Sequence, residues 1–272
     1  MLLTIIYLLS ALAATGLWLL TDALWVWPVG FVGCFLLSLL ICFLIVVVEA
    51  KRSDPTIEHT TDDPRIRTIV KLYAPAVFRL LGCKIHVVGK ELIPTQGRFL
   101  LVCNHLQDLD PGVILASFPE AQLGFIAKKE VLEMPILNRL MPRLLCQFID
   151  RENDRNALKT ILKCISILKD DAASIAVFPE GRITGDDLLH HFRPGVFKMA
   201  QKANVPIVVC TLYGTQNIPA NVKKLRRTHI DLHVLGVIPA EELKGVTTVD
   251  IAARVHAMMA EDLGPDKVAN EK

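Results

Sequence analysis

The chain has 272 residues and a mass of 30.2 kDa, enough for one ordinary domain with an additional segment. Its formal net charge of +2 and pI near 8.1 lack the concentrated basic character of duplex-binding proteins, so we expect no nucleic-acid partner, whereas an anionic membrane surface is compatible. Hydrophobic residues make up 52% of the sequence and are concentrated in the first fifty positions, which separates an apolar amino-terminal segment from a domain of soluble α/β character.

Two long uncharged runs open the chain, at positions 1–21 and 23–48, with Asp22 between them. A helix rises ~1.5 Å per residue, so each run can cross a hydrocarbon core of ~30 Å. We therefore predict a membrane-embedded helical hairpin over residues 1–50. The connection around Asp22 is too short to hold a domain, so both ends lie on one side, and Lys51 with Arg52 places that side in the cytoplasm. The predicted location is the cell membrane, with the rest of the chain on the cytoplasmic face.

Two other interpretations of this segment stay open. A cleaved signal peptide would fit the small residues at Ala11-Leu12-Ala13, although no basic residue precedes the first apolar run and a longer apolar run follows it. A hairpin inserted into one leaflet would place Trp18, Trp25 and Trp27 at the interface. In both hairpin arrangements the domain is tethered to the lipid bilayer.

Residues 51–82 are expected to form a basic juxtamembrane segment. Basic and apolar side chains alternate at helical spacing after Pro64, with Asp62 or Asp63 as the amino-terminal cap and Gly82 as the stop. This helix either lies near the membrane or is an ordinary packing helix. Basic residues cluster again at positions 223–227, as a solvated surface or as a contact for an anionic membrane.

Apolar strand-like runs then alternate with helical stretches over residues 83–264. This alternation predicts an α/β domain with a mostly parallel central sheet of about seven strands and flanking helices. The expected strands are Lys84–Val88, Phe99–Cys103, Leu123–Ala127, Cys146–Ile149, Ser174–Phe178, Ile207–Leu212 and Ile230–Val237. The expected helices include Val131–Leu140, Arg155–Leu168 and Val196–Lys202. Residues 265–272 are expected to be a frayed, charged tail.

The seven cysteines form no Cys-x-x-Cys pair, which indicates reduced thiols in a reducing compartment. The sequence contains no Walker-type, zinc-protease or serine-hydrolase motif. His190 and His191 lack a further ligand at zinc-site spacing and are interpreted as polar loop residues. We therefore expect no bound metal or cofactor.

Two polar clusters follow apolar runs, and loops after parallel strands are where ligand sites form. The first contains His105, which can accept a proton near neutral pH, and Asp110, which can orient the imidazole ring; Asp108 is an alternative partner. The second runs from Phe178 to Arg182 and combines backbone N–H groups, one acid and one guanidinium, which suits an oxyanion. The sequence therefore predicts a base beside an anion site.

Four short blocks, in the same order, resemble those of the glycerolipid acyltransferase family over roughly residues 85–240. The first block is histidine-x4-aspartate, which His105 and Asp110 match. The second, third and fourth are Gly124–Glu130 with Phe148–Arg151, Phe178–Arg182, and Val205–Val208 with Gly214-Thr215. Any one block would be a weak signal, but the four together are a strong one.

The resemblance implies a membrane-bound lysophospholipid O-acyltransferase. The expected reaction moves a fatty acyl group from a thioester donor, acyl-CoA or acyl-acyl carrier protein, to the sn-2 hydroxyl of 1-acylglycerol 3-phosphate and gives phosphatidic acid. His105 is then the general base and Asp110 its orienting partner. Because the lipid hydroxyl itself can attack the thioester, no protein nucleophile is needed, and Cys103 is interpreted as a packing residue.

The resemblance also implies residues that bind the substrates. Glu180, Gly181 and Arg182 are expected to frame the lipid phosphate. Lys128 is expected to hold the phosphate or the thioester oxyanion, and Lys129 is the alternative for this role. Arg193 is a further candidate for the phosphate, and a structural salt bridge is the alternative role for Arg151. The expected substrate-binding residues are Lys128, Arg151, Glu180, Gly181 and Arg182.

Two departures from the family's pattern limit what the resemblance implies. Gln107 stands where the family commonly has serine, and Arg182 follows Gly181 directly instead of by two positions. The second variant resembles some lysophosphatidylethanolamine acyltransferases, so that lysolipid or another one is the alternative acceptor. A catalytically silent lipid-binding or scaffold protein is the alternative of another class. The presence of both His105 and Asp110 counts against it, because a protein that only binds lipid needs no general base.

Overall fold

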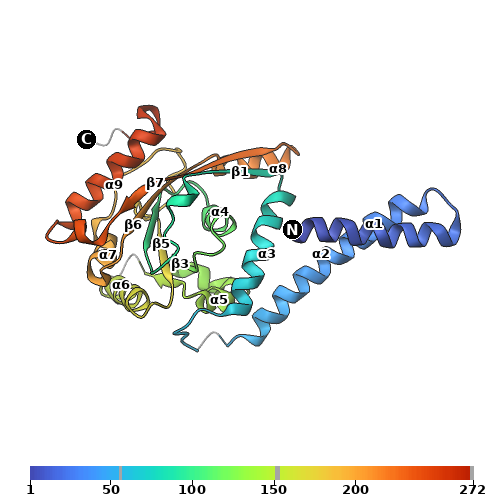
Figure 1. The fold of residues 1–272 in the computed structure, drawn as a ribbon, viewed down its shortest axis with the longest axis horizontal. Helices are drawn as coiled ribbons and strands as arrows, with labels where there is room; N and C mark the ends of the chain where they lie inside the picture. Colours follow the sequence, from blue (N-terminus) through green and yellow to red (C-terminus); the bar gives the residue numbers. More distant parts are fainter. Residues whose placement is uncertain (55–56, 151–153, 270–272) are drawn as a thin grey trace. The chain divides into compact units, whose positions relative to one another are not determined.

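The computed structural model describes residues 1–54, 57–150 and 154–269, in two compact units that comprise residues 1–56 and 57–272 (Figure 1). The first unit is a pair of helices, α1 (Leu2–Thr21) and α2 (Val26–Arg52), joined by a turn in which Asp22 is left-handed. Tyr7 stacks on Phe35 with ring centroids 4.9 Å apart, and Trp27 Nε1 donates a hydrogen bond to Thr15 Oγ1 at 3.1 Å. By length and composition, both helices are apolar enough to cross a membrane, which confirms the predicted apolar pair.

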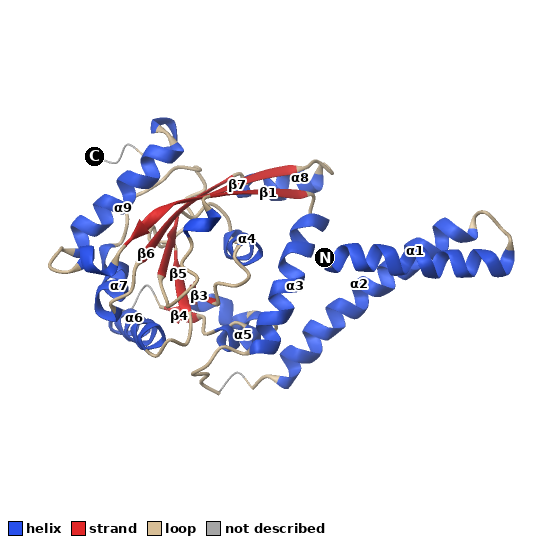
Figure 2. Cartoon of the chain, in the orientation of Figure 1, coloured by secondary structure: helices blue, strands red, loops and turns tan. Residues whose placement is uncertain are grey.

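The described residues of the second unit form one seven-stranded sheet in the order β1-β7-β6-β2-β5-β3-β4, with helices on both faces (Figure 2). The strands are β1 (Cys83–Val88), β2 (Leu100–Cys103), β3 (Leu123–Lys128), β4 (Gln147–Ile149), β5 (Ser174–Val177), β6 (Ile207–Tyr213) and β7 (Thr228–Ile238). The five strands from β6 to β4 in this order are parallel, whereas β7 is antiparallel to β6 and pairs in parallel with β1. This topology confirms the predicted α/β domain with a mostly parallel sheet.

Two apolar cores lie on opposite faces of this sheet. The helices of the unit are α3 (Pro64–Leu80), α4 (Asp110–Ser117), α5 (Leu137–Leu140), α6 (Asp154–Lys169), α7 (Lys198–Ala203), α8 (Ile218–Lys223) and α9 (Thr248–Leu263). Successive residues of β2 alternate between the cores: Leu101 and Cys103 pack with α3 and α4, whereas Leu100 and Val102 pack with α6, α7 and α9. Because both faces are covered, the strand is a continuous apolar run.

Helix α3 begins at the cap that the sequence predicts. The Asp63 carboxylate accepts hydrogen bonds from the N–H groups of Arg65 and Ile66 at 2.9 and 3.3 Å. The helix ends at Leu80, shortly before Gly82, whose φ of 73° suits a chain reversal. Ile66 and Phe78 lie in the core, so α3 is a packing element of the second unit.

Two expectations about local structure are wrong. Pro135 interrupts the helix expected at Val131–Leu140, which is a 3-10 turn at Lys129–Glu133 followed by the short α5. The helical stretch expected at Val196–Lys202 is present, as the 3-10 turn Pro194–Phe197 that continues directly into α7. The tail is not frayed over residues 265–269: the Leu189 N–H donates to the Lys267 carbonyl at 2.8 Å, and the Ala269 N–H donates to the Leu189 carbonyl at 3.0 Å. Residues 270–272 lie outside the described part of the chain.

Candidate active site

Both predicted polar clusters lie at one edge of the sheet. Strands β2 and β5 are parallel neighbours, so the loop that begins at Asn104 and the loop that begins at Phe178 leave the sheet side by side. The N–H of His105 in the first loop donates to Glu180 Oε1 in the second at 2.8 Å. A direct bond thus joins residues 75 positions apart in the chain.

His105 and Asp110 form a hydrogen-bonded pair. His105 Nδ1 lies 2.9 Å from Asp110 Oδ2, and the same oxygen accepts the N–H groups of Leu106 and Gln107 at 2.7 and 2.9 Å. Asp110 is fully buried at the start of α4, whereas His105 is partly exposed. The imidazole and two backbone N–H groups thus share one carboxylate oxygen, which holds the proton of the ring on Nδ1 and leaves Nε2 as the basic nitrogen. Asp108, the alternative partner, is exposed.

Two further side chains fix the position and the plane of the imidazole. Asn104, only 2% exposed, uses its amide to donate to the Leu212 carbonyl at 2.8 Å and to accept the Leu212 N–H at 2.7 Å, which ties the loop to β6. Phe178 stacks on the His105 ring with centroids 4.1 Å apart and an angle of 15° between the planes. The ring is therefore held at one end by a carboxylate and on one face by an aromatic ring.

Glu180 joins the two loops of the site. Its other oxygen accepts the N–H of His190 at 3.1 Å, and the side chain of His190 pairs with Asp186 at 2.8 Å. Burial raises the pKa of Glu180 to about 7, although the two backbone N–H groups and both histidines act in the opposite direction. Burial alone would raise the pKa of Asp186, but hydrogen bonds from Thr184 and His190 outweigh it and lower that pKa to about 2.

The turn after Glu180 packs against Arg193 through the backbone of Gly181. Gly181 has φ of 75°, and a Cβ on it would lie 2.8 Å from Nε of Arg193, so this arginine packs against the glycine backbone. The Arg193 N–H donates to the Pro179 carbonyl at 2.8 Å. Arg182 is exposed. Glycine therefore suits both the backbone conformation and the close approach of Arg193.

The other predicted residues have different surroundings. Lys128 is the exposed last residue of β3, at the same edge of the sheet, and Lys129 Nζ pairs with Asp150 at 3.0 Å. Arg151 lies outside the described residues. Burial raises the pKa of the Cys103 thiol well above its usual value, so the thiolate needed for a nucleophile is disfavoured.

Sequence reasoning assigned no individual role to Asn104 and Phe178, although they begin the two predicted clusters, and it interpreted His190 as a polar loop residue. Asn104 and Phe178 adjoin predicted residues, and that adjacency was the available signal. The role of His190 depends on its backbone N–H, which carries no signal in the sequence. Among the described residues, no group of three or more histidine, cysteine or acidic side chains is placed to hold a metal ion.

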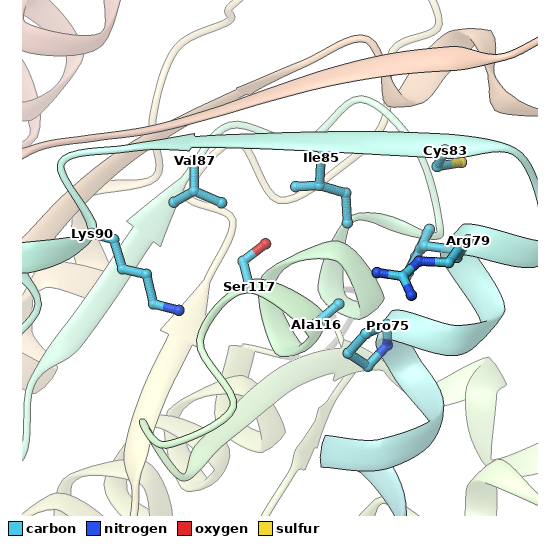
Figure 3. Close-up of a pocket in the computed structure, with 9 residues that line it drawn as sticks. Pro75, Arg79, Cys83, Ile85, Val87, Lys90, Ala116 and Ser117 are labelled. Atoms are coloured by element: carbon cyan, nitrogen blue, oxygen red, sulfur yellow. The ribbon is translucent and has the colours of Figure 1, made fainter. Parts of the chain in front are cut away.

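A pocket of about 260 Å³ lies between α3, β1 and α4 (Figure 3). Ile85 and Val87 extend into it from β1, and Ser117 from α4. Arg79 and Lys90 provide cationic groups among these walls. None of the predicted site residues lines this pocket.

Comparison with known proteins places this geometry in a family. The sequence model of the Acyltransferase family matches residues 84–213. A probable 1-acyl-sn-glycerol-3-phosphate acyltransferase of Mycoplasma genitalium is 32% identical over 200 residues, which is 71% of this chain and 70% of that protein. The 1-acyl-sn-glycerol-3-phosphate acyltransferase of Borreliella burgdorferi is 33% identical over 139 residues, which is 51% of this chain and 54% of that protein.

A solved structure supports the fold. The crystal structure of the 1-acyl-sn-glycerophosphate acyltransferase PlsC from Thermotoga maritima has a TM-score of 0.64 to this chain, with 21% sequence identity and coverage of 99% of this chain and 100% of that one. At this identity the likeness concerns the fold. The family match and the extent of the similarity to the Mycoplasma protein show that this chain belongs to the acyltransferase family and is an enzyme of that family.

Proposed function

We propose that this enzyme transfers a fatty acyl group from a thioester donor to the sn-2 hydroxyl of 1-acylglycerol 3-phosphate and forms phosphatidic acid. The observation that carries the proposal is the 2.9 Å contact between His105 Nδ1 and the buried Asp110 carboxylate, at the edge where the sheet presents its loops. Such a pair is suited to general-base catalysis. The names of the relatives supply the class of acceptor, and acylation of its hydroxyl gives the product.

In the proposed step, His105 Nε2 accepts the proton of the lipid hydroxyl while the hydroxyl oxygen attacks the thioester carbonyl. Collapse of the tetrahedral intermediate forms the ester and breaks the carbon–sulfur bond. The imidazolium returns the proton to the departing thiolate, so the free thiol leaves and the histidine is neutral again. Asp110 stabilises the transient positive charge. The donor is acyl-CoA or acyl-acyl carrier protein, and no bound cofactor takes part.

The turn after β5 is proposed to bind the phosphate of the lysolipid. Arg182 supplies charge-assisted hydrogen bonds, Gly181 allows close approach of the backbone, and Glu180 holds this turn against the loop of the base. Lys128 is proposed to neutralise the phosphate or the thioester oxyanion. Arg151 keeps the substrate-binding role that the family resemblance gives it.

The two apolar helices are proposed to anchor the enzyme in the cell membrane. Lys51 and Arg52, in the last turn of α2, support a position of the acyltransferase unit on the cytoplasmic face by the positive-inside tendency. A lysophospholipid carries one acyl chain and partitions into the bilayer, so an anchored enzyme meets its acceptor there. The partners are therefore the lipid bilayer, the lysolipid and the acyl donor.

Replacement of the base tests the mechanism. We expect His105→Ala to lower turnover by about 10²–10⁴-fold, because positioned proton transfer is worth that much, while membrane association and fold are retained. Asp110→Asn should be severely but less completely impaired, and the exposed Asp108→Asn is the matched control with turnover near wild type. The measurement is product formation by mass spectrometry with purified protein. Near-wild-type turnover of His105→Ala would show that the mechanism is wrong.

Replacement of Arg182 tests the acceptor. Loss of charge-assisted hydrogen bonds, each worth about 1.5–3 kcal/mol, should raise the KM for 1-acylglycerol 3-phosphate roughly 10- to 100-fold in Arg182→Ala, with a smaller effect on turnover at saturation. The effect should be weaker for lysophosphatidylethanolamine, because a phosphodiester carries less charge than a phosphomonoester. Equal KM values for the two proteins would remove Arg182 from the site. A wild-type preference for the ethanolamine lipid would establish the second candidate function, which the direct Gly181-Arg182 succession favours.

A further inference from the structure

One exposed loop has a composition that folding does not explain. The α8–β7 loop, defined here to include the last residue of α8, consists of Lys223, Lys224, Leu225, Arg226 and Arg227, all exposed. Leu225 at its tip is 96% exposed, so its side chain contributes almost nothing to the core. Its φ of 52° is left-handed, a conformation that glycine or asparagine adopts more readily than a branched residue. Leucine at this tip therefore strains the backbone of the folded unit, and packing of its side chain does not offset that strain.

The four cations of the loop face solvent without carboxylate partners: no ion pair within residues 57–150 and 154–269 includes any of their side chains. The backbone, in contrast, is well held. The Arg226 N–H donates to the Asn221 carbonyl at 2.8 Å, and the Thr228 N–H donates to the Gly82 carbonyl at 3.2 Å. The loop thus presents an apolar tip flanked by cations on a fixed backbone.

The sheet places this loop on the side of the molecule where His105 lies. Tyr213 at the end of β6 pairs with Asp231, so the first three residues of the antiparallel β7 continue past the end of β6. At ~3.3 Å per residue, they carry the loop roughly 10 Å beyond that edge. β6 is the neighbour of β2, and His105 follows β2. The loop therefore projects outward from the same edge as the candidate base.

We propose that the α8–β7 loop is a second membrane contact, which inserts Leu225 among the lipid chains and sets its four cations on anionic head groups. An apolar side chain between cations matches the layers of a bilayer surface, where each cation adds about fivefold to partitioning. An acidic protein would complement the charges but would provide no apolar surroundings for the Leu225 side chain. This contact would hold the edge with His105 at the lipid surface. The inference rests on the proposed membrane location and not on the proposed chemistry.

The test uses full-length protein in vesicles that contain phospholipids brominated on their acyl chains, with and without phosphatidylglycerol. Trp18, Trp25 and Trp27 are first replaced by phenylalanine, and L225W then supplies the only tryptophan of the chain. The matched control is V249W in the same background, since Val249 is 62% exposed and lies on α9. We expect loss of emission by contact with bromine for L225W in anionic vesicles, less in neutral ones, and none for V249W. Brominated lipids lie in both leaflets, so the quenching is detected whichever way the protein is oriented in the vesicle.

Charge variants separate the two parts of the proposal. K223E/K224E in the L225W background should remove the quenching, whereas K198E/K202E, which changes the same number of exposed cations on α7, should leave it unchanged. Quenching that is equal in neutral vesicles and unaffected by K223E/K224E would overturn the role of the cations. Absence of quenching in both vesicles would overturn the contact, and an emission change on addition of acyl carrier protein would assign the loop to an acidic protein. The readout needs no substrate, so it is independent of whether acyl transfer is confirmed.

Discussion

A single oxygen atom organises the candidate base. Asp110 Oδ2 receives the imidazole and two backbone N–H groups of the preceding turn, so one carboxylate both closes the turn and orients the ring. These roles are separable by chemistry. An amide at this position still has one oxygen for the turn, but it lacks the negative charge that stabilises an imidazolium. This is the reason to test Asp110→Asn instead of a truncation, which would leave buried backbone N–H groups without acceptors.

Gly181 offers a comparison between two glycines at the residue scale. Gly181 and Gly185 both have positive φ, of 75° and 81°, so an alanine at either position should cost roughly 1–2 kcal/mol of stability. Only Gly181 has a neighbour that a Cβ would displace, because nothing lies within 4 Å of the position at Gly185. If Arg193 helps to bind the anion, Gly181→Ala should raise the KM for the lysolipid several-fold more than Gly185→Ala does.

Thermal midpoints of the two variants establish whether the backbone cost is the same. Steady-state kinetics with 1-acylglycerol 3-phosphate then isolate the effect on Arg193. Equal KM values at equal stability would show that the packing of Arg193 on Gly181 has no part in substrate binding.

At the scale of elements, Glu180 is the tie between the loop after β2 and the loop after β5. It accepts the N–H of His105 with one oxygen and the N–H of His190 with the other, from a site that is 6% exposed. A carboxylate in this position costs free energy when it ionises, since burial outweighs the two hydrogen bonds. The tie between the loops is therefore sensitive to protonation.

This sensitivity predicts how stability changes with pH. The pKa of Glu180 rises from 4.5 in the reference state to about 7 in the folded state, so the folded enzyme retains a proton that the unfolded chain has released. Its contribution to stability is complete below pH 4.5 and is lost as the pH rises toward 7, with a total on the order of 3 kcal/mol. Relative to Glu180→Gln, the wild type should become less stable across this interval.

Chemical denaturation in detergent between pH 4.5 and 8 measures the effect. The Gln variant loses one acceptor and starts from a different stability, so the slope against pH is the quantity to compare. Glu241→Gln removes an exposed carboxylate and should keep the wild-type slope. Parallel curves for the wild type and Glu180→Gln would contradict the raised pKa.

The elements that the sequence predicts well are those in which one effect, such as burial of apolar side chains on both faces, determines the residue pattern. The expected strands at Phe99–Cys103 and Ser174–Phe178 agree with β2 and β5 to within one residue at each end, because burial on both faces demands an unbroken apolar run. The helix expected at Val131–Leu140 is wrong because the apolar periodicity continues across Pro135, whereas the backbone does not. A proline inside a helical pattern removes a backbone hydrogen bond and interrupts the helix.

The candidate site was predictable where side-chain chemistry is visible and not where backbone groups act. His105, Asp110 and Glu180 have the right chemistry at strand ends, and the fold brings them together. The bonds of Asn104 to Leu212 join residues 108 positions apart, and their partner is a backbone amide that any residue would supply. Such a pairing follows only from the order of the strands, which the sequence pattern did not provide.

At the scale of the whole molecule, the proposed anchoring makes a prediction about sidedness. We replace Cys34 and Cys42 by alanine, leaving the buried cysteines of the second unit, and introduce Asp266→Cys at an exposed position. A membrane-impermeant maleimide should label this cysteine in inverted vesicles and not in intact spheroplasts, because the positive flank of α2 favours the cytoplasm. Labelling only from the outside would overturn this topology.

A second cysteine distinguishes the two hairpin arrangements. Asp22→Cys lies in the turn between α1 and α2. A hairpin that spans the bilayer exposes it to reagent in intact spheroplasts, whereas a hairpin in one leaflet hides it from both sides.

The two backbone bonds between residues 267–269 and the loop of the site form late in synthesis, because these residues follow the rest of the acyltransferase unit in the chain. Leu189 is buried and precedes His190, whose N–H donates to Glu180. The backbone of Leu189 donates to the Lys267 carbonyl and accepts the Ala269 N–H. Some 217 residues (269 − 52) separate the end of α2 from Ala269, and at ~5–20 residues per second their translation takes roughly 10–40 s. In the proposed membrane setting, the apolar helices thus reach the bilayer well before the loop is closed. A chain that stops in the last turn of α9 would lack both backbone bonds to Leu189, the neighbour of His190, whose N–H donates to Glu180.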